Sequence, residues 1–270
     1  MRPAVIYARS AEYAAAIRKA DALIASPDFS KRKDEARTCA GVADVPASGR
    51  VFIKRTSSRS WLAGFVERIT GSRAERAVSG ARILEGASLP HPRMLAAMEI
   101  RHLGAVRASF LMSEVLEDAD TLSRFALGPG GIKGRDVRRR NRISDAVAAV
   151  VRRCHDAGIY TRDLQETNIM VVDDGVGGFK VFFIDLEDFR RTGSVSERQR
   201  LINLVHLDRS IGRFMCRASR LDFLYSYLGG RPERSEARRI VNEILALRGQ
   251  IENRRRRQHQ LVREHVRVRG

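Results

Sequence analysis

Cysteines and long apolar runs are scarce in this sequence. The three cysteines, Cys39, Cys154 and Cys216, are widely spaced, form no CxxC pair and have no histidine at metal-ligand spacing around them. This pattern favours reduced thiols in a cytosolic protein. Beyond the N-terminal segment, the longest apolar stretch, residues 146–151, is far too short to cross a bilayer. The sequence therefore predicts a protein that is not integral to a membrane.

An export signal is also missing from the N-terminal segment. Basic residues interrupt its apolar positions before a signal-peptide core could form, and these are Arg2, Arg9, Arg18 and Lys19. We therefore expect a cytoplasmic protein whose contact with the inner membrane, if it has one, is peripheral.

Acidic residues are outnumbered by basic ones. Fifty Lys and Arg residues face 32 Asp and Glu residues, a formal net charge of +18. A field of this size attracts polyanions such as anionic lipid, phosphorylated sugar or nucleic acid, of which nucleic acid is the least favoured but not excluded. Much of the excess is scattered, as a general preference for arginine would produce. Two clusters stand out, the five arginines within residues 135–142 and the run Arg254–Arg257.

The pattern of apolar and turn residues predicts a mixed α+β N-terminal region. Residues 11–24 have the period of an amphipathic helix, and residues 31–49 combine turn residues with the short apolar pieces of a small antiparallel sheet. The compact β-type run Val51–Ile53 follows, and it places Lys54 at the end of a strand.

Helical patterns become dominant after this sheet. Ser72 and Glu75 have the spacing of a capping box and start a helix that should run to about Glu85. The GPGG sequence at residues 128–131 resembles a hinge, and residues 138–157 repeat apolar positions at the spacing of a core helix. The other predicted elements are a short helix within residues 57–72, strands at 108–112, 169–172 and 179–184, and helices from 196 onward.

Segment 161–168, TRDLQETN, places an aspartate and an asparagine five positions apart on one loop, Asp163 and Asn168. This is close to the H-R-D-L-x-x-x-N pattern of kinase catalytic loops. Phosphoryl transfer needs a carboxylate that orients the attacking hydroxyl, metal ligands beside the phosphates, and a cation on the phosphate tail. In that chemistry Asp163 would be the base and Asn168 a magnesium ligand.

Two further segments supply the remaining groups. The apolar run 181–184 delivers Asp185, a carboxylate that can reach a magnesium ion bridging phosphates, and Asp188 is a second candidate. Upstream, Lys54 ends a run like the V-A-I-K strand, whose lysine contacts the α and β phosphates of ATP and is held by a helix carboxylate. Glu75 is the predicted partner of Lys54.

Taken singly, these residues have ordinary explanations. An aspartate or asparagine in a loop is usually a turn former, and a lysine after apolar residues usually marks the solvated end of a strand. His155 ends the long predicted helix, where an imidazole bonded to backbone is commoner than a general base. A kinase is favoured by the order of the candidate residues along the chain, rather than by any one of them. This order is Lys54, Glu75, Asp163, Asn168 and Asp185.

At this point the sequence resembles the lipopolysaccharide kinases, the Kdo/heptose kinase or WaaP-like family that phosphorylates Kdo or heptose in the bacterial inner core. The resemblance is carried by CHDAGIYTRDLQETNIMV, VFFIDLEDFRR and RQRLINLVHLDRSI, and it covers roughly residues 50–215. It implies a two-lobed protein-kinase-like α+β fold, with a small N-terminal lobe of antiparallel sheet and one main helix and a larger, mostly helical C-terminal lobe. The expected divisions are an N-terminal helical extension (1–30), the N-lobe (31–115), the C-lobe (116–250) and a basic tail (251–270).

The sequence departs from the kinase pattern at three points. Thr161 stands at the position of the catalytic-loop histidine, which in kinases mainly supports the structure. Leu186 and Glu187 follow Asp185 without the glycine of a DFG motif, and no glycine-rich phosphate loop is obvious before Lys54.

We therefore expect a phosphotransferase that uses ATP and Mg²⁺ and acts on a sugar hydroxyl of a lipopolysaccharide-type glycolipid, or another anionic acceptor, at the cytoplasmic face of the inner membrane. Two alternatives stay open. One is a kinase of the same fold with a protein or small-molecule acceptor. The other is a catalytically silent pseudokinase whose basic face binds a polyanion.

Overall fold

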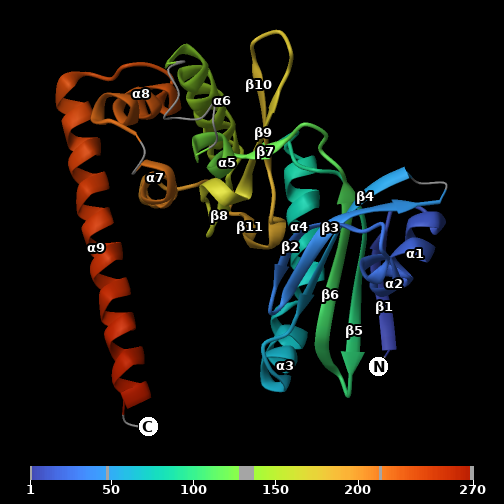
Figure 1. Ribbon diagram of the computed structural model, residues 1–270. Helices are drawn as coiled ribbons and strands as arrows, with labels where there is room; N and C mark the ends of the chain where they lie inside the picture. Colours follow the sequence, from blue (N-terminus) through green and yellow to red (C-terminus); the bar gives the residue numbers. More distant parts are fainter. Residues whose placement is uncertain (1, 47–48, 128–136, 213–214, 268–270) are drawn as a thin grey trace. The chain divides into compact units, whose positions relative to one another are not determined.

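The structure is a computed structural model that describes residues 2–46, 49–127, 137–212 and 215–267 (Figure 1). The contacts within the chain divide it into two compact units. The first unit consists of Met1–Ala119 and Val181–Arg191, and the second of Asp120–Lys180 and Thr192–Gly270. The predicted hinge at 128–131 lies outside the described residues.

A six-stranded antiparallel sheet forms the first unit. Its order is β1-β5-β6-β4-β3-β2. The bounds are β1 (Arg2–Ala8), β2 (Ser30–Glu35), β3 (Thr38–Val45), β4 (Gly49–Ser57), β5 (Met94–His102) and β6 (Ala105–Glu114). The helices of this unit are α1 (Ala11–Arg18), α2 (Ala20–Ala25), α3 (Trp61–Thr70) and α4 (Arg73–Glu85).

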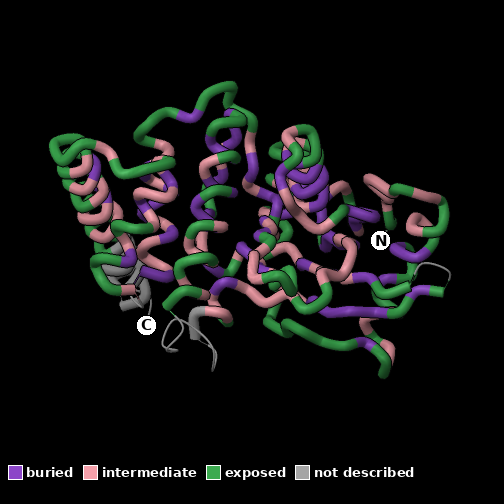
Figure 2. Tube along the Cα trace, turned by 90° about the horizontal axis from the view of Figure 1, so that it is seen from above, coloured by how far each residue is buried: buried purple, intermediate pink, exposed green. Residues whose placement is uncertain are grey.

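The core of the first unit follows the two-residue period of its strands. Val51 and Ile53 of β4 are fully buried beside Phe110 and Met112 of β6, and Ile17 of α1 packs into the same cluster. Figure 2 shows buried positions recurring along the helices and strands. Each such side chain stabilises the fold by about 1.5–3 kcal/mol. This buried core therefore fixes the positions of the strands that carry the polar residues.

Two details of the first unit differ from the sequence-based expectation. Residues 1–30 were expected to be a helical extension, whereas Arg2–Ala8 forms strand β1 and pairs with β5. This pairing joins residues far apart in the sequence, so a local pattern does not reveal it. Lys54 lies inside β4 rather than at its end, because β4 keeps its pairing with β3 and β6 as far as Thr56.

Helices make up most of the second unit. They are α5 (Leu122–Leu127), α6 (Val137–Asp156), α7 (Glu197–Ile211), α8 (Arg217–Leu228) and α9 (Arg234–Arg267). Of the predicted core positions of α6, Val147, Val150, Val151 and Cys154 are buried and Ile143 is partly buried. The basic tail expected from residue 251 is not a separate element, since α9 runs through that position without a break.

Short strands and turns connect these helices. They are β7 (Asp120–Thr121), β8 (Ile159–Thr161), the 3-10 turn η1 (Glu166–Asn168), β9 (Ile169–Asp173), β10 (Phe179–Phe183), the 3-10 turn η2 (Leu186–Asp188) and β11 (Phe189–Arg191). The predicted hairpin of β9 and β10 is present, and the chain passes into the first unit at Val181.

The chain therefore has the expected α+β fold class, with an antiparallel sheet in its N-terminal region and a mostly helical C-terminal part. Within the residues that the structure describes, no helix is long and apolar enough to cross a membrane.

Candidate active site

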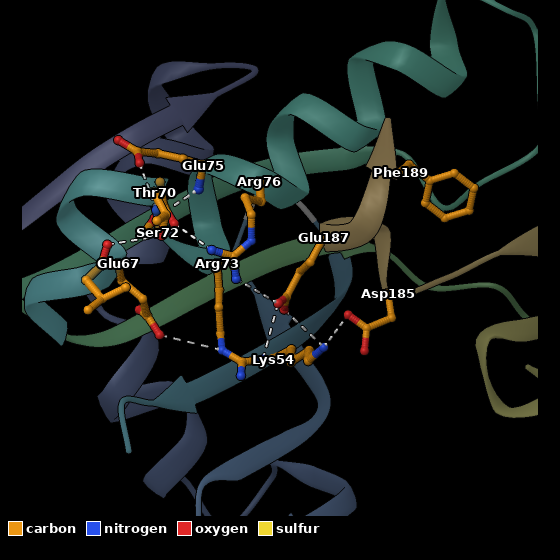
Figure 3. A network of polar contacts seen from close by, with 12 residues as sticks. Lys54, Glu67, Thr70, Ser72, Arg73, Glu75, Arg76, Asp185, Glu187 and Phe189 are labelled. Atoms are coloured by element: carbon orange, nitrogen blue, oxygen red, sulfur yellow. Dashed lines mark hydrogen bonds and ion pairs between the residues drawn. The ribbon is translucent and has the colours of Figure 1, made fainter. Parts of the chain in front are cut away.

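Lys54 projects from β4 toward two carboxylates of the turn that follows β10. Its Nζ lies 2.9 Å from Oδ1 of Asp185 and 3.6 Å from Oε1 of Glu187 (Figure 3). All three residues belong to the first unit, although 131 positions separate Lys54 from Asp185. The structure thus brings together the lysine and the aspartate that the sequence singled out.

Asp185 holds an uncommon backbone conformation. Its φ angle is 58°, in the left-handed region that aspartate tolerates better than most residues do. Two residues earlier, the Phe183 amide donates a hydrogen bond to the Pro90 carbonyl oxygen at 3.0 Å, so the end of β10 is fixed to the first unit. The left-handed turn then changes the chain direction between the strand and η2.

Glu187 is the buried centre of an ion-pair network. Besides Lys54, it contacts two arginines of α4, with Oε2 lying 3.2 Å from Nη1 of Arg73 and 3.7 Å from Nη2 of Arg76 (Figure 3). Burial raises the pKa of the Glu187 carboxyl, and the positive charge of Lys54 is the largest opposing influence. Together with Asp185, and with Glu67 at 3.9 Å from Arg73, the group contains three cations and three carboxylates. The formal charges therefore balance, and Lys54 is the cation that lies beside Asp185.

A close helix contact supports this turn. Gly80 of α4 faces the Leu186 carbonyl oxygen, and a Cβ at Gly80 would lie 2.0 Å from that oxygen. Only a residue without a side chain lets α4 approach η2 so closely. Gly80 therefore helps to place Arg76, one turn earlier on α4, beside Glu187.

The predicted partnership between Lys54 and Glu75 is wrong. Glu75 Oε2 accepts a hydrogen bond from the Ser72 amide at 2.9 Å, while the Glu75 amide donates to Ser72 Oγ. Its other carboxylate oxygen lies 3.7 Å from Nη2 of Arg101. The predicted capping box is thus present. It also explains the error, because a glutamate in a capping box folds back onto its own helix N-terminus.

The residues of the predicted catalytic loop form a second group, which lies in the second unit. Both carboxylate oxygens of Asp163 accept hydrogen bonds from Nε2 of Gln165 at 2.9 Å. Nδ2 of Asn168 donates to Asp163 Oδ2 at 2.9 Å and to the Asp163 carbonyl oxygen at 3.0 Å. The structure brings Asp163 and Asn168 together and leaves the amide oxygen of Asn168 facing away from these bonds.

Thr161 and His155 belong to a hydrogen-bond network that adjoins this loop. The Thr161 hydroxyl oxygen accepts a hydrogen bond from the Asp163 amide at 3.3 Å, and the Thr161 carbonyl oxygen accepts one from Asn203 at 2.8 Å. Asn203 Oδ1 in turn lies 3.0 Å from Nε2 of buried His155, whose Nδ1 lies 2.8 Å from the Tyr227 hydroxyl. Burial lowers the pKa of His155. The imidazole is bonded to side chains rather than to backbone, and it connects α6, α7, α8 and β8.

Four residues of these two groups escaped the sequence analysis: Glu187, Arg73, Arg76 and Gln165. Glu187 was noticed only because it follows Asp185 where a glycine was expected. The two arginines stand three positions apart in the first turn of α4, a spacing that does place them on one helix face. The sequence therefore shows that the two arginines share a helix face, but it does not show that this face contacts Glu187 of η2.

Three comparisons with known proteins bear on these groups. The family model described as lipopolysaccharide kinase (Kdo/WaaP) family matches residues 58–227, a range that includes both carboxylate groups but not Lys54. CBL-interacting protein kinase 20 of Oryza sativa subsp. japonica is 32% identical over 116 residues, which cover 43% of this chain and only 22% of that protein.

A solved structure described as "WaaP in complex with acyl carrier protein" aligns with a TM-score of 0.63 and 20% identity, over 94% of this chain and 99% of that chain. This similarity shows the fold. Since the family model covers more than half of the sequence, the chain is a kinase and belongs to the lipopolysaccharide kinase (Kdo/WaaP) family.

Proposed function

We propose that this kinase transfers the γ-phosphoryl group of ATP, with Mg²⁺, to a sugar hydroxyl of a lipopolysaccharide-type glycolipid core. The observation that carries the nucleotide part is the contact between Lys54 and Asp185, which pairs a strand lysine with the carboxylate after β10. Phosphoryl transfer depends on such a cation and such a carboxylate beside the phosphates. The family supplies the acceptor class.

In the first unit, Lys54 would bind the phosphate tail and Glu187 would orient Lys54. Glu187 therefore takes the positioning task that protein kinases give to a glutamate on a helix. The helix of this chain, α4, presents cations instead, and Arg73 and Arg76 balance the charge of Glu187. The contact of Lys54 with Asp185 also favours Asp185 over Asp188 as the carboxylate at the phosphates.

In the second unit, Asp163 would orient the acceptor hydroxyl and take its proton. Two neutral amide side chains, Gln165 and Asn168, hold its carboxylate without cancelling its charge. A carboxylate held in this way keeps the orientation and the charge that a base in phosphoryl transfer needs.

Asn168 and Asp185 offer the ligand types that Mg²⁺ prefers. Asp185 binds Lys54 through Oδ1 and retains Oδ2, and Asn168 retains its amide oxygen. Magnesium is usually held by one or two protein oxygens together with substrate phosphates, so a complete all-protein cage is not required. The ion would neutralise charge that develops on the phosphates. The bounds of the N-lobe at 31–115 and of the C-lobe at 116–250 remain a proposal.

The rice protein kinase similarity gives one alternative some weight, namely a protein acceptor. The decisive experiment incubates radiolabelled ATP and Mg²⁺ with lipid extract or with protein extract from Gram-negative cells. We expect label in the lipid fraction with the wild type and none with Asp163→Asn. Asp222→Asn, the same charge change at an exposed position of α8, is the matched control and should label lipid normally. Label in protein alone would select the protein acceptor, and no label in either fraction would support a pseudokinase.

A further inference from the structure

Helix α3 exposes its large apolar residues to water. Ile69 is 82% exposed, Leu62 69% and Trp61 48%, and Phe65 and Val66 are exposed as well. These five residues occupy positions 1, 2, 5, 6 and 9 of the helix, a spacing that gathers them on one face. We name the set the α3 apolar face: Trp61, Leu62, Phe65, Val66 and Ile69.

The opposite side of α3 holds the helix to the sheet. Gly64 lies against β6 so closely that a Cβ there would be 2.2 Å from the Val106 carbonyl oxygen. The one acid of the helix, Glu67, has a side chain that is only 17% exposed and that lies 3.9 Å from Arg73. The helix is therefore attached through its small and polar residues. Burial of apolar surface on folding would favour the reverse orientation, with the large apolar residues packed against the sheet.

The hairpin between β5 and β6 extends this face. Its tip carries Leu103, which is 78% exposed and has a φ angle of 49°. The next residue, Gly104, lies against the guanidinium of Arg68, a residue of α3. Figure 1 shows α3 beside the end of the β5–β6 hairpin. Leu103 thus belongs to the same exposed surface as the α3 apolar face.

Arginines lie next to this surface. Arg59, Arg68 and Arg107 are all exposed on α3, the residues before it or the hairpin. The Arg68 guanidinium also lies 5.9 Å from the centroid of the Phe65 ring. An apolar helix face that contains tryptophan and is bordered by arginines is the signature of a helix that lies in a membrane interface. Such arginines gain most when the lipids are anionic.

We propose that the α3 apolar face, together with Leu103, docks this kinase on an anionic lipid bilayer. The aliphatic side chains and the Phe65 ring enter the boundary between headgroups and acyl chains, Trp61 lies at the interface, and the arginines bind lipid phosphates. The choice of a bilayer over a protein partner rests on the proposed glycolipid acceptor and on the positive charge around the face. The exposure of α3 itself does not depend on that function.

Trp61 is the only tryptophan of the chain, so its fluorescence reports on this surface directly. The experiment titrates the full chain with vesicles of phosphatidylcholine containing about 30% phosphatidylglycerol, and with pure phosphatidylcholine as the neutral comparison. We expect a blue shift and quenching by brominated lipid with the anionic vesicles, both weakened by salt. The double variant Leu62→Ser/Ile69→Ser should bind the vesicles about tenfold more weakly or worse, because two apolar side chains no longer leave water.

The matched control is Val176→Ser/Leu245→Ser, which removes two exposed apolar residues elsewhere and should bind like the wild type. Vesicle binding without a Trp61 shift, or equal binding by Leu62→Ser/Ile69→Ser, would overturn the proposal. A third outcome would also overturn it: the wild type is a dimer, and Leu62→Ser/Ile69→Ser converts it to a monomer without changing the vesicle affinity. In that case the α3 apolar face would join two copies of the chain. ATP turnover on detergent-dispersed acceptor is measured in parallel, and its loss or survival tests the phosphotransfer separately from the docking.

Discussion

The two groups of proposed active-site residues hold their carboxylates by different means. In the first unit, Asp185 and Glu187 are paired with cations, whereas in the second unit Asp163 is held by the neutral amides of Gln165 and Asn168. In the proposed function, ion pairing places and balances the charges that would meet an anionic nucleotide. Amide hydrogen bonds fix the direction of a carboxylate while its negative charge stays available to attract a proton. The difference matches a division between phosphate binding and acceptor activation.

The largest loss of turnover is expected for substitution of Asp163. Asp163→Asn keeps the size of the side chain but removes the base, so we expect turnover to fall about 10³-fold or more. Steady-state phosphate transfer to lipid acceptor measures this. Gln165→Ala is the companion variant, because it removes both hydrogen bonds from Gln165 to Asp163 and leaves the carboxylate in place. Its turnover should fall about tenfold or less. Equal losses in both variants would contradict a base at position 163.

Lys54 gives the next largest effect. Lys54→Met keeps the aliphatic stem in the sheet and removes the cation, so we expect turnover to fall about 10²–10³-fold. The same substitution leaves Asp185 and Glu187 without one of their partners. Transfer kinetics at saturating and at limiting ATP check the prediction. Turnover within a few-fold of the wild type would exclude Lys54 from phosphate binding.

The next prediction tests whether Glu187, rather than Glu75, is the carboxylate that positions Lys54. Glu187→Gln should lower kcat/KM for ATP about 10–100-fold, because Lys54 loses its buried carboxylate and the cations of α4 lose their counter-charge. Glu75→Ala is the contrasting variant. It removes the side-chain half of the capping box, the bond that Glu75 accepts from the Ser72 amide, so we expect a loss of about 1 kcal/mol or less in unfolding free energy and near-normal kcat/KM. The opposite ranking in kcat/KM would return the role of lysine partner to Glu75.

The smallest effect concerns the support beneath the catalytic loop. Native His155 stays neutral because burial lowers its pKa, while the unfolded chain takes up a proton near pH 6.5. The contribution of His155 to the unfolding free energy is therefore fully present above that pH and decreases as the pH falls.

Urea unfolding at several pH values measures this slope. We expect His155→Gln to flatten it and to reduce stability by about 1–3 kcal/mol at neutral pH. His102→Gln, at an exposed histidine, should leave both unchanged. A slope that persists in His155→Gln would show that other groups cause it.

Local patterns explain how much of this fold the sequence could predict. The β-run at Val51–Ile53, the capping box at Ser72 and the hairpin before Asp185 depend on neighbouring residues, and all three are present. Strand β1 was missed because its pairing with β5 is a long-range contact. Strand β5 was missed because it is almost continuously buried, and so lacks the alternation that marks a half-buried strand.

The candidate site follows the same rule. The spacing of Asp163 and Asn168 lies within one loop, and their hydrogen bond agrees with the pattern that singled them out. Glu187 was missed because its place in the site depends on ion pairs with Lys54, Arg73 and Arg76, which come from distant segments of the chain. The exposure of α3 was equally hidden, since its residues predict a short helix but not which face meets the sheet.

The central claim is that both groups serve one transfer of phosphate from ATP, with separate tasks. The most direct test measures Mg²⁺-dependent ATP binding by calorimetry and phosphate transfer by radiolabel in the wild type, Asp163→Asn and Asp185→Asn. We predict that both variants lose transfer, that Asp163→Asn still binds ATP with Mg²⁺, and that Asp185→Asn loses the magnesium dependence of binding. Transfer at the wild-type rate by Asp163→Asn would contradict the account.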